Sequence, residues 1–133
     1  MNVSDYLGIP YHFRNENGGI CCWGLYCLVM KNERGIELED IPVNTPSLKE
    51  AAAGFAIFLA TSKDRKMIEK DKPQDFDLVL ISKDGANKKP HHCGVYYKGK
   101  VLHANGQGTT GQVWYDELNK FNNFKIRFFR YEN

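Results

Sequence analysis

The first half of the chain has hydrophobic positions at helical spacing. Leu25, Leu28 and Val29 share one face of a predicted helix that follows Gly18-Gly19, and Gly35 is a suitable residue for its end. Residues 1–20 are expected to form an approach segment that packs through its aromatic side chains and ends in a loop. This arrangement places Cys22 in the first turn of the helix.

A second helix is predicted from the capping-box sequence Ser47-Leu48-Lys49-Glu50 to about Ser62. Its apolar positions lie on one face, as expected of a helix that packs against a core. Residues 33–46 contain two prolines and no sustained period, so they are predicted to be a connection. Residues 62–74 alternate in charge, and we expect a solvated turn or a short helix there.

From Asp75 onward the hydrophobic period becomes that of strands. One buried strand, one hairpin around Lys98-Gly99 and two further strands are predicted at residues 76–82, 92–97 with 100–104, 113–115 and 125–131. The polar stretches 84–90 and 106–111 are predicted to be loops. The N-terminal helices are therefore expected to pack on a mostly antiparallel sheet, which is an α+β arrangement.

Length and composition indicate one domain that covers residues 1–133. The apolar content of 42% and charged content of 26% are ordinary for a soluble globular protein with a sufficient core. The net charge of +2 is too small to attract nucleic acid, so we expect no nucleic-acid partner. The longest apolar segment, 51–61, is too short to span a bilayer, and residues 1–10 show no secretory signal, so we expect no membrane partner.

The chain has four cysteines, and their arrangement favours free thiols. Cys21 and Cys22 are adjacent, and Cys93 stands between a histidine and a glycine, which is a poor framework for disulfides. A zinc site would have to combine these thiols with Cys27 and the pair His91-His92 at irregular spacing, so we expect no metal and no cofactor. The simplest alternative is that the first three cysteines are small core residues.

Cys22 is the candidate nucleophile because of its predicted place at the start of a helix. The unpaired backbone amides and the positive end of the helix dipole favour an anion there, so the pKa of the thiol should fall below its usual value of about 8.5. A cysteine nucleophile also needs a base within hydrogen-bond reach. The base in turn needs a third group that fixes its orientation.

The register of the predicted hairpin can be counted from its loop. If Lys98-Gly99 forms a two-residue loop, Tyr97 lies opposite Lys100, and Gly94 lies opposite His103. A three-residue loop would reverse this parity, and Lys-Gly is a weaker hairpin signal than Asn-Gly.

This register brings two histidines to the same side of the sheet. His92 and His103 become diagonal neighbours about 7 to 8 Å apart by backbone, and Gly94 leaves space for the His103 ring to lean toward His92. His91 and Cys93 point to the other side. We therefore predict that Cys22, His92 and His103 form one site, whereas the alternative is that each histidine is a buried structural residue.

Three motifs follow one another along the chain, and they are Cys22-Trp23-Gly24-Leu25, His92-Cys93-Gly94-Val95-Tyr96 and Leu102-His103-Ala104. Together they resemble the NlpC-type cell-wall cysteine peptidases, and most closely the branch found in phage tail proteins. Residues 6–11 with Gly18-Gly19 match the segment that precedes the nucleophile, and Asp77-Leu78-Val79 matches the strand before the histidine. The resemblance extends over residues 6–118.

The resemblance implies a papain-like α+β fold and hydrolysis of an amide bond in peptidoglycan stem peptides, of the D-glutamyl-diaminopimelate type. It implies Cys22 as nucleophile, His92 as base and then acid, and His103 as the orienting group. Tyr11 matches a family tyrosine whose hydroxyl would help to bind the oxyanion or substrate. Cys21 stands where the family usually has Asp, a change expected to remove a helix-capping acceptor.

Two alternative functions follow from the same residues. A catalytically impaired tail assembly or structural module would keep the fold, and the residue at position 21 is compatible with it. An acyl or lipid transferase on a circularly reordered fold fits poorly, because the cysteine precedes the histidines here. The resemblance also implies a place in a phage virion tail or in the infected-cell cytoplasm, action at the bacterial cell wall, and other tail proteins as partners.

Overall fold

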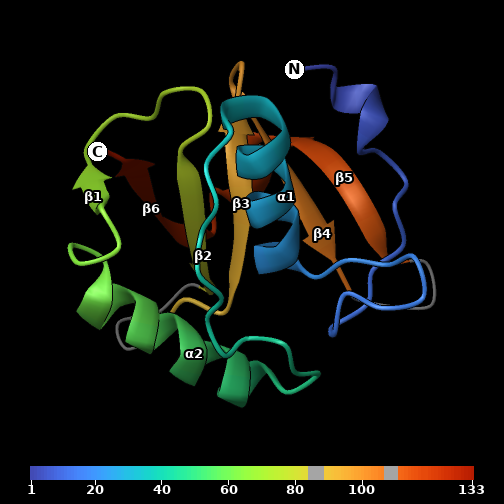
Figure 1. Cartoon of the computed structure of the whole chain (residues 1–133), viewed down its shortest axis with the longest axis horizontal. Helices are drawn as coiled ribbons and strands as arrows, with labels where there is room; N and C mark the ends of the chain where they lie inside the picture. Colours follow the sequence, from blue (N-terminus) through green and yellow to red (C-terminus); the bar gives the residue numbers. More distant parts are fainter. Residues whose placement is uncertain (84–88, 107–110) are drawn as a thin grey trace.

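The computed structural model describes residues 1–83, 89–106 and 111–133, so most of the predicted loops 84–90 and 106–111 lies outside the described residues. The chain begins with a short 3-10 helix, η1, and two α-helices (Figure 1). A second 3-10 helix, η2, precedes the last strand. In chain order the elements are η1 (Val3–Asp5), α1 (Cys22–Arg34), α2 (Leu48–Thr61), β1 (Met67–Lys70), β2 (Leu78–Lys83), β3 (His92–Tyr97), β4 (Lys100–Asn105), β5 (Gln112–Glu117), η2 (Leu118–Phe121) and β6 (Phe124–Tyr131).

The strands form one sheet in the order β1-β6-β2-β3-β4-β5, and each of these neighbouring pairs is antiparallel. Helices come first and the sheet follows, so the predicted α+β class is confirmed. The helix α1 packs against β3 and β4, and Figure 1 shows it lying along β3. Among the described helices, none is both long enough and apolar enough to cross a membrane.

The main core lies between the two α-helices and one face of the sheet. Trp23 of α1 packs against Phe58 of α2, and Phe58 in turn meets Phe129 of β6 edge to face. Leu78 and Leu102 contribute to this core from the sheet, and all five side chains are buried. Burial of an apolar side chain of this size contributes about 1.5 to 3 kcal/mol, so this layer holds α1 firmly on the sheet.

Both α-helices begin and end close to the predicted residues. Gly35 ends α1 in the left-handed conformation with φ of 65°, and its N–H donates to the carbonyls of Lys31 and Met30. Ser47 caps α2 by accepting from the Glu50 N–H at 3.3 Å. The reciprocal half of the predicted capping box is absent from this described segment, because the Glu50 carboxylate accepts from the hydroxyl of Thr45 at 2.7 Å instead.

Of the segment 62–74, predicted to be a solvated turn or short helix, residues 62–66 form a turn, but the prediction was wrong for residues 67–70, which form strand β1. This edge strand pairs with β6, its Met67 is buried, and Glu69 makes a two-point ion pair with Arg127 at 2.8 Å. The strand begins after Lys66, which has a positive φ of 62°. Four residues with one buried side chain are too few to show a strand period, and the partner strand lies sixty residues later in the sequence.

The hairpin of β3 and β4 has the predicted two-residue loop and register. Tyr97 lies opposite Lys100 and Val95 opposite Leu102, while Lys98 and the following glycine have φ of 49° and 83°. Two positive φ values are the mark of a type I′ turn, whose twist suits a hairpin. The Lys98 N–H also donates to a carboxylate oxygen of Asp75 at 2.9 Å, which helps a non-glycine residue to keep this conformation.

The other face of the sheet carries a smaller apolar cluster. Val79, Ile81, Val101 and Phe121 are buried there, and Phe121 comes from η2. The ring of His103 meets the Phe121 ring edge to face, with centroids 5.4 Å apart. This contact places His103 on the face away from α1, as the predicted parity requires.

Candidate active site

The start of α1 is built around Cys21, which is the N-cap residue. Its sulfur accepts a hydrogen bond from the Gly24 N–H at 3.3 Å, and its thiol donates to the amide oxygen of Asn44 at 3.3 Å. Its own N–H donates to the side-chain oxygen of Asn15 at 2.8 Å. The expectation that Cys21 removes the capping acceptor was therefore wrong, because the thiol sulfur takes that role. Burial raises the pKa of Cys21 to about 11, so this residue stays a neutral thiol.

Gly24 allows the preceding loop to approach the helix. A Cβ on Gly24 would collide with the side chain of Asn15, the same side chain that accepts from the Cys21 backbone. Asn15 itself has a positive φ of 57°, a conformation that asparagine tolerates better than most residues. The Cys22-Trp23-Gly24-Leu25 motif therefore requires glycine for a steric reason, because a side chain at this position would displace the loop that caps the helix.

Cys22 is the first residue of α1 and is partly exposed. Figure 1 shows that α1 and β3 begin at the same end of the sheet. A hydrogen bond with Cys93 and, against the effect of burial, a hydrogen bond and the charge of His92 hold the pKa of Cys22 well below its usual value. Burial, together with the neighbouring Cys22, raises the pKa of Cys93, so Cys93 is the thiol that keeps its proton. The arrangement favours a Cys22 thiolate.

The two contacts of Cys22 come from opposite sides of the same strand. Cys93 is completely buried in the core between helices and sheet, as the predicted parity for this residue requires. His92 is the first residue of β3, and its ring meets that of His103 on the other face. A sulfur at the end of the sheet can therefore reach both side chains. His91, just before the strand, donates its backbone N–H to the carbonyl of Ile81 at 3.1 Å.

A chain of short contacts leads from His92 into the sheet. His92 Nε2 lies 2.8 Å from His103 Nδ1, and His103 Nε2 lies 2.7 Å from a carboxylate oxygen of Asp116. Burial and the charge of His92 lower the pKa of His103 to about 4, so this buried ring is neutral near pH 7. Because Nε2 of His92 is engaged with His103, Nδ1 is the nitrogen left for Cys22.

Asp116 was not predicted from the sequence as a residue of the site. It belongs to β5, in which Trp114 lies directly opposite His103, so Asp116 occupies the diagonal position on the same face. The predicted strand 113–115 stopped one residue short of it. The sequence of residues 112–117 shows no clear alternation, and the connection at 106–111 is too long for the register of the next strand to be counted from a turn.

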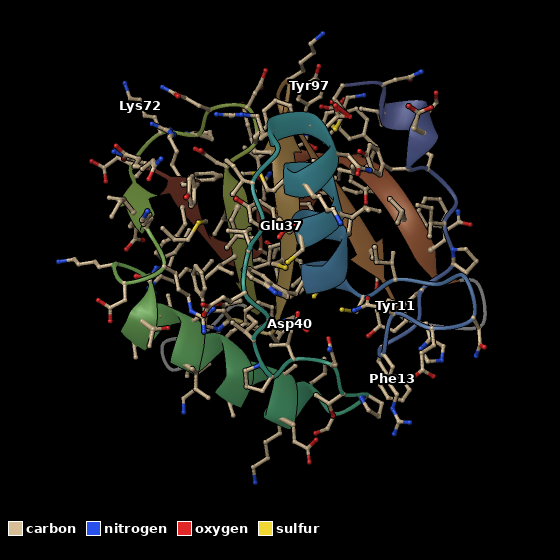
Figure 2. The ribbon with its side chains drawn as sticks, viewed as in Figure 1. Tyr11, Phe13, Glu37, Asp40, Lys72 and Tyr97 are labelled. Atoms are coloured by element: carbon tan, nitrogen blue, oxygen red, sulfur yellow. The ribbon has the colours of Figure 1, made fainter. Side chains whose placement is uncertain are left out.

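Tyr11 lies in the loop before α1, close to the start of that helix (Figure 2). Its N–H donates to the carbonyl of Gly111 at 3.0 Å, and a Cβ on Gly106 or Gly111 would press on its side chain. Burial, with the nearby sulfurs of Cys22 and Cys21, raises the pKa of Tyr11 to about 12. The hydroxyl therefore keeps its proton and is available as a donor beside Cys22.

The structure brings Cys22, His92 and His103 together, with Tyr11 beside the sulfur. A thiolate next to an imidazole whose other nitrogen is held by a third group is an arrangement suited to nucleophilic attack on a carbonyl. Cys27 takes no part in this arrangement. Burial raises its pKa to about 12, and it packs against the core from the second turn of α1.

Comparisons with protein-family models and with curated protein sequences find no match. Among solved structures, the chain is similar to the crystal structure of the NlpC/p60 domain of peptidoglycan hydrolase SagA. The two share 16% sequence identity at a TM-score of 0.55, and the match covers 95% of this chain and 91% of the other. Identity at this level establishes the fold alone, and the predicted papain-like α+β fold is confirmed.

Proposed function

We propose that this protein is a thiol endopeptidase that cleaves an amide bond in peptidoglycan stem peptides, with Cys22 as nucleophile. The observation that carries the proposal is the pairing of a partly exposed Cys22, whose pKa is lowered, with His92 at the start of β3. The fold of a peptidoglycan hydrolase domain and the motif resemblance support the choice of substrate.

The first half of the reaction uses the thiolate and the imidazolium. Cys22 Sγ attacks the amide carbonyl carbon, and the oxygen of the tetrahedral intermediate becomes negative. The Tyr11 hydroxyl and the Cys22 backbone N–H would donate hydrogen bonds to this oxygen. The C–N bond then breaks, His92 gives its proton to the leaving amine, and the acyl group stays on Cys22 as a thioester.

The second half returns the enzyme to its starting state. His92 Nδ1 takes a proton from water, and the hydroxide equivalent attacks the thioester carbon. The C–S bond breaks, the new carboxylic acid leaves, and the thiolate of Cys22 is again paired with the imidazolium of His92. His103 holds the His92 ring through both halves by the contact at 2.8 Å.

The alternative of a catalytically impaired tail module was motivated by Cys21. The sulfur cap on Gly24 supplies the acceptor that this change was expected to remove, and the start of α1 is intact. This contact favours the active enzyme. The D-glutamyl-diaminopimelate bond, the phage tail location and partners among tail proteins follow from the sequence resemblance and belong to the same proposal.

The proposal is tested by mass spectrometry of peptidoglycan digests. Purified walls that contain diaminopimelate and walls that contain lysine are incubated with the parent protein, with Cys22→Ala and with Cys27→Ala. We expect new peptide ends at the D-glutamyl bond with the parent and Cys27→Ala, and none with Cys22→Ala. Release of the same peptides by Cys22→Ala would refute the mechanism, and no release from either wall by the folded parent would favour the structural module.

A further inference from the structure

The carboxylate of Asp116 has a defined partner on each oxygen. Oδ2 lies 2.7 Å from His103 Nε2, and Oδ1 lies 3.1 Å from the ammonium of Lys120. Burial acts to raise the pKa of Asp116, but the hydrogen bonds and charges of His103 and Lys120 outweigh it and hold this pKa below its usual value. The side chain is therefore an ionised carboxylate near pH 7, and it can only accept hydrogen bonds.

An acceptor at this position determines where the protons are on both histidines. His103 must carry its proton on Nε2 to donate to Asp116, and as a neutral ring it then has a bare Nδ1. This nitrogen accepts from His92, so the proton of His92 in the 2.8 Å contact lies on Nε2. Nδ1 of His92 is left bare toward Cys22, which is the nitrogen that a general base needs.

The hydrogen bonds from His92 to His103 and from His103 to Asp116 keep the same direction in both charge states of the site. When His92 takes the proton of Cys22 on Nδ1, its Nε2–H still donates to His103, and His103 still donates to Asp116. The titratable groups around these hydrogen bonds are Cys22 on α1, Cys93 on β3 and Lys120 on η2, with Tyr11 and Cys21 close to Cys22 before α1. Within the part of the chain that the structure describes, the carboxylate of Asp116 is the group in hydrogen-bond contact with His103 Nε2, so it selects between the two neutral forms of His103.

We infer that Asp116 is a positioning residue, which acts through His103 to keep the bare nitrogen of His92 facing Cys22 and to stabilise the Cys22–His92 ion pair. This inference rests on the proposed function. Without the carboxylate, His103 can move its proton to Nδ1 and donate to His92 Nε2. His92 would then carry its own proton on Nδ1, facing the sulfur, and the neutral ring would be unable to accept the thiol proton.

The test measures the pH dependence of Cys22 alkylation by iodoacetamide, with the modified peptide identified by tandem mass spectrometry. Asp116→Ala is compared with Glu117→Ala, a change of the next residue on the same strand, which is exposed and pairs with Lys100 at 3.4 Å. We expect the midpoint to rise by about one pH unit in Asp116→Ala and to stay at the parent value in Glu117→Ala. Equal midpoints in the two variants would overturn the inference.

A second pair of variants tests the same inference if Asp116→Ala does not fold. Asp116→Asn keeps an oxygen that can accept from His103 and removes the charge, and Glu117→Gln is its control. We expect a rise in the midpoint smaller than that of Asp116→Ala, with unchanged thermal unfolding. A midpoint identical to that of Glu117→Gln would contradict a role for the carboxylate charge.

The tautomers can also be observed directly by nitrogen NMR of the ring atoms in the Cys22→Ala background, in which His92 is free of the thiolate. We expect the Nε2–H form for both histidines, and loss of this form at His103 when Asp116→Ala is added. The Nδ1–H form at His103 before that change would overturn the inference. These measurements use no peptidoglycan, so the expected shift in Asp116→Ala together with no wall cleavage by the parent would refute only the proposed function.

Discussion

At the residue scale, the reactivity assigned to Cys22 depends on its side-chain neighbours. The hydrogen bond from Cys93 is the largest influence that lowers the pKa of Cys22, and His92 adds a hydrogen bond and a charge. Cys93 keeps its own proton because burial and the nearby sulfur raise its pKa. A buried thiol is thus a donor to a partly exposed thiolate.

Replacement of Cys93 tests this role. Cys93→Ala removes the donor, so we expect the pKa of Cys22 to rise and the acid side of the pH profile of kcat/KM to move to higher pH. Cys27→Ala removes a thiol from the same helix without touching Cys22 and should change neither. The pKa is measured by the ultraviolet absorbance of the thiolate, and an unchanged titration in Cys93→Ala would contradict the assignment.

Tyr11 is predicted to act on the oxyanion. Tyr11→Phe removes the hydroxyl and keeps the ring that packs against Gly106, so kcat for wall peptides should fall about 100-fold with little change in KM. Tyr6→Phe is the control, because the Tyr6 hydroxyl donates to Glu33 at 3.2 Å, away from the site. Equal kcat values in the two variants, at equal thermal stability, would show that the Tyr11 hydroxyl is not used.

At the element scale, the hairpin of β3 and β4 sets the geometry of the two histidines. Its two glycines, Gly94 and Gly99, constrain different parts of the hairpin. A Cβ on Gly94 would lie 2.6 Å from Val101 Cγ1 and 3.0 Å from His103 Cβ, whereas a Cβ on Gly99 would meet nothing within 4 Å and be strained only by its φ of 83°. Gly94 therefore controls the position of His103, and Gly99 controls only the turn.

This difference predicts a separation of stability from activity. Gly99→Ala should lower the free energy of unfolding by about 1 kcal/mol and leave the activity of the folded protein unchanged. Gly94→Ala should cost about 2 kcal/mol through overpacking and also lower kcat strongly, because His103 must shift. Urea unfolding and peptide release are measured on both variants, and full activity of Gly94→Ala would contradict the account.

The hairpin also shows how much of the site the sequence could reveal. The pairing of His92 with His103 was predictable because a two-residue turn lets both strands be counted from Lys98-Gly99. Asp116 was not predictable, because β5 follows a longer connection and its register depends on tertiary packing. The lowered pKa of Cys22 was expected from the helix start, but the contact with Cys93 needs α1 and β3 in place.

At the scale of the whole molecule, the fold could be predicted for those elements whose own sequence shows a helical or strand period of hydrophobic residues. The helices and the hairpin have such a period, and their order gave the α+β class. The edge strand β1 has none, because its formation depends on hydrogen bonds to β6 at the other end of the chain. Pairing between strands that are distant in the sequence could not be predicted, because no local sequence pattern indicates it.

The stability of the whole molecule should depend on the buried His103. Its pKa falls from 6.5 to about 4 on folding, so the unfolded chain binds more protons between these values, and the free energy of unfolding decreases as the pH is lowered through this window. The effect is at most about 3 kcal/mol. We expect urea unfolding to show it in the parent and a flatter profile in His103→Gln. The same slope in both proteins would contradict the burial of a neutral ring.

The proposed function requires the sulfur of Cys22 for cleavage, and stepwise chemical blocking of that sulfur tests this requirement. The protein is alkylated in steps, and the alkylated fraction of Cys22 from mass spectrometry is compared with the remaining rate of peptide release from peptidoglycan. We expect the rate to fall in proportion to the alkylated fraction and to reach zero when Cys22 is fully modified. Peptide release at the original rate from protein with fully alkylated Cys22 would contradict this requirement.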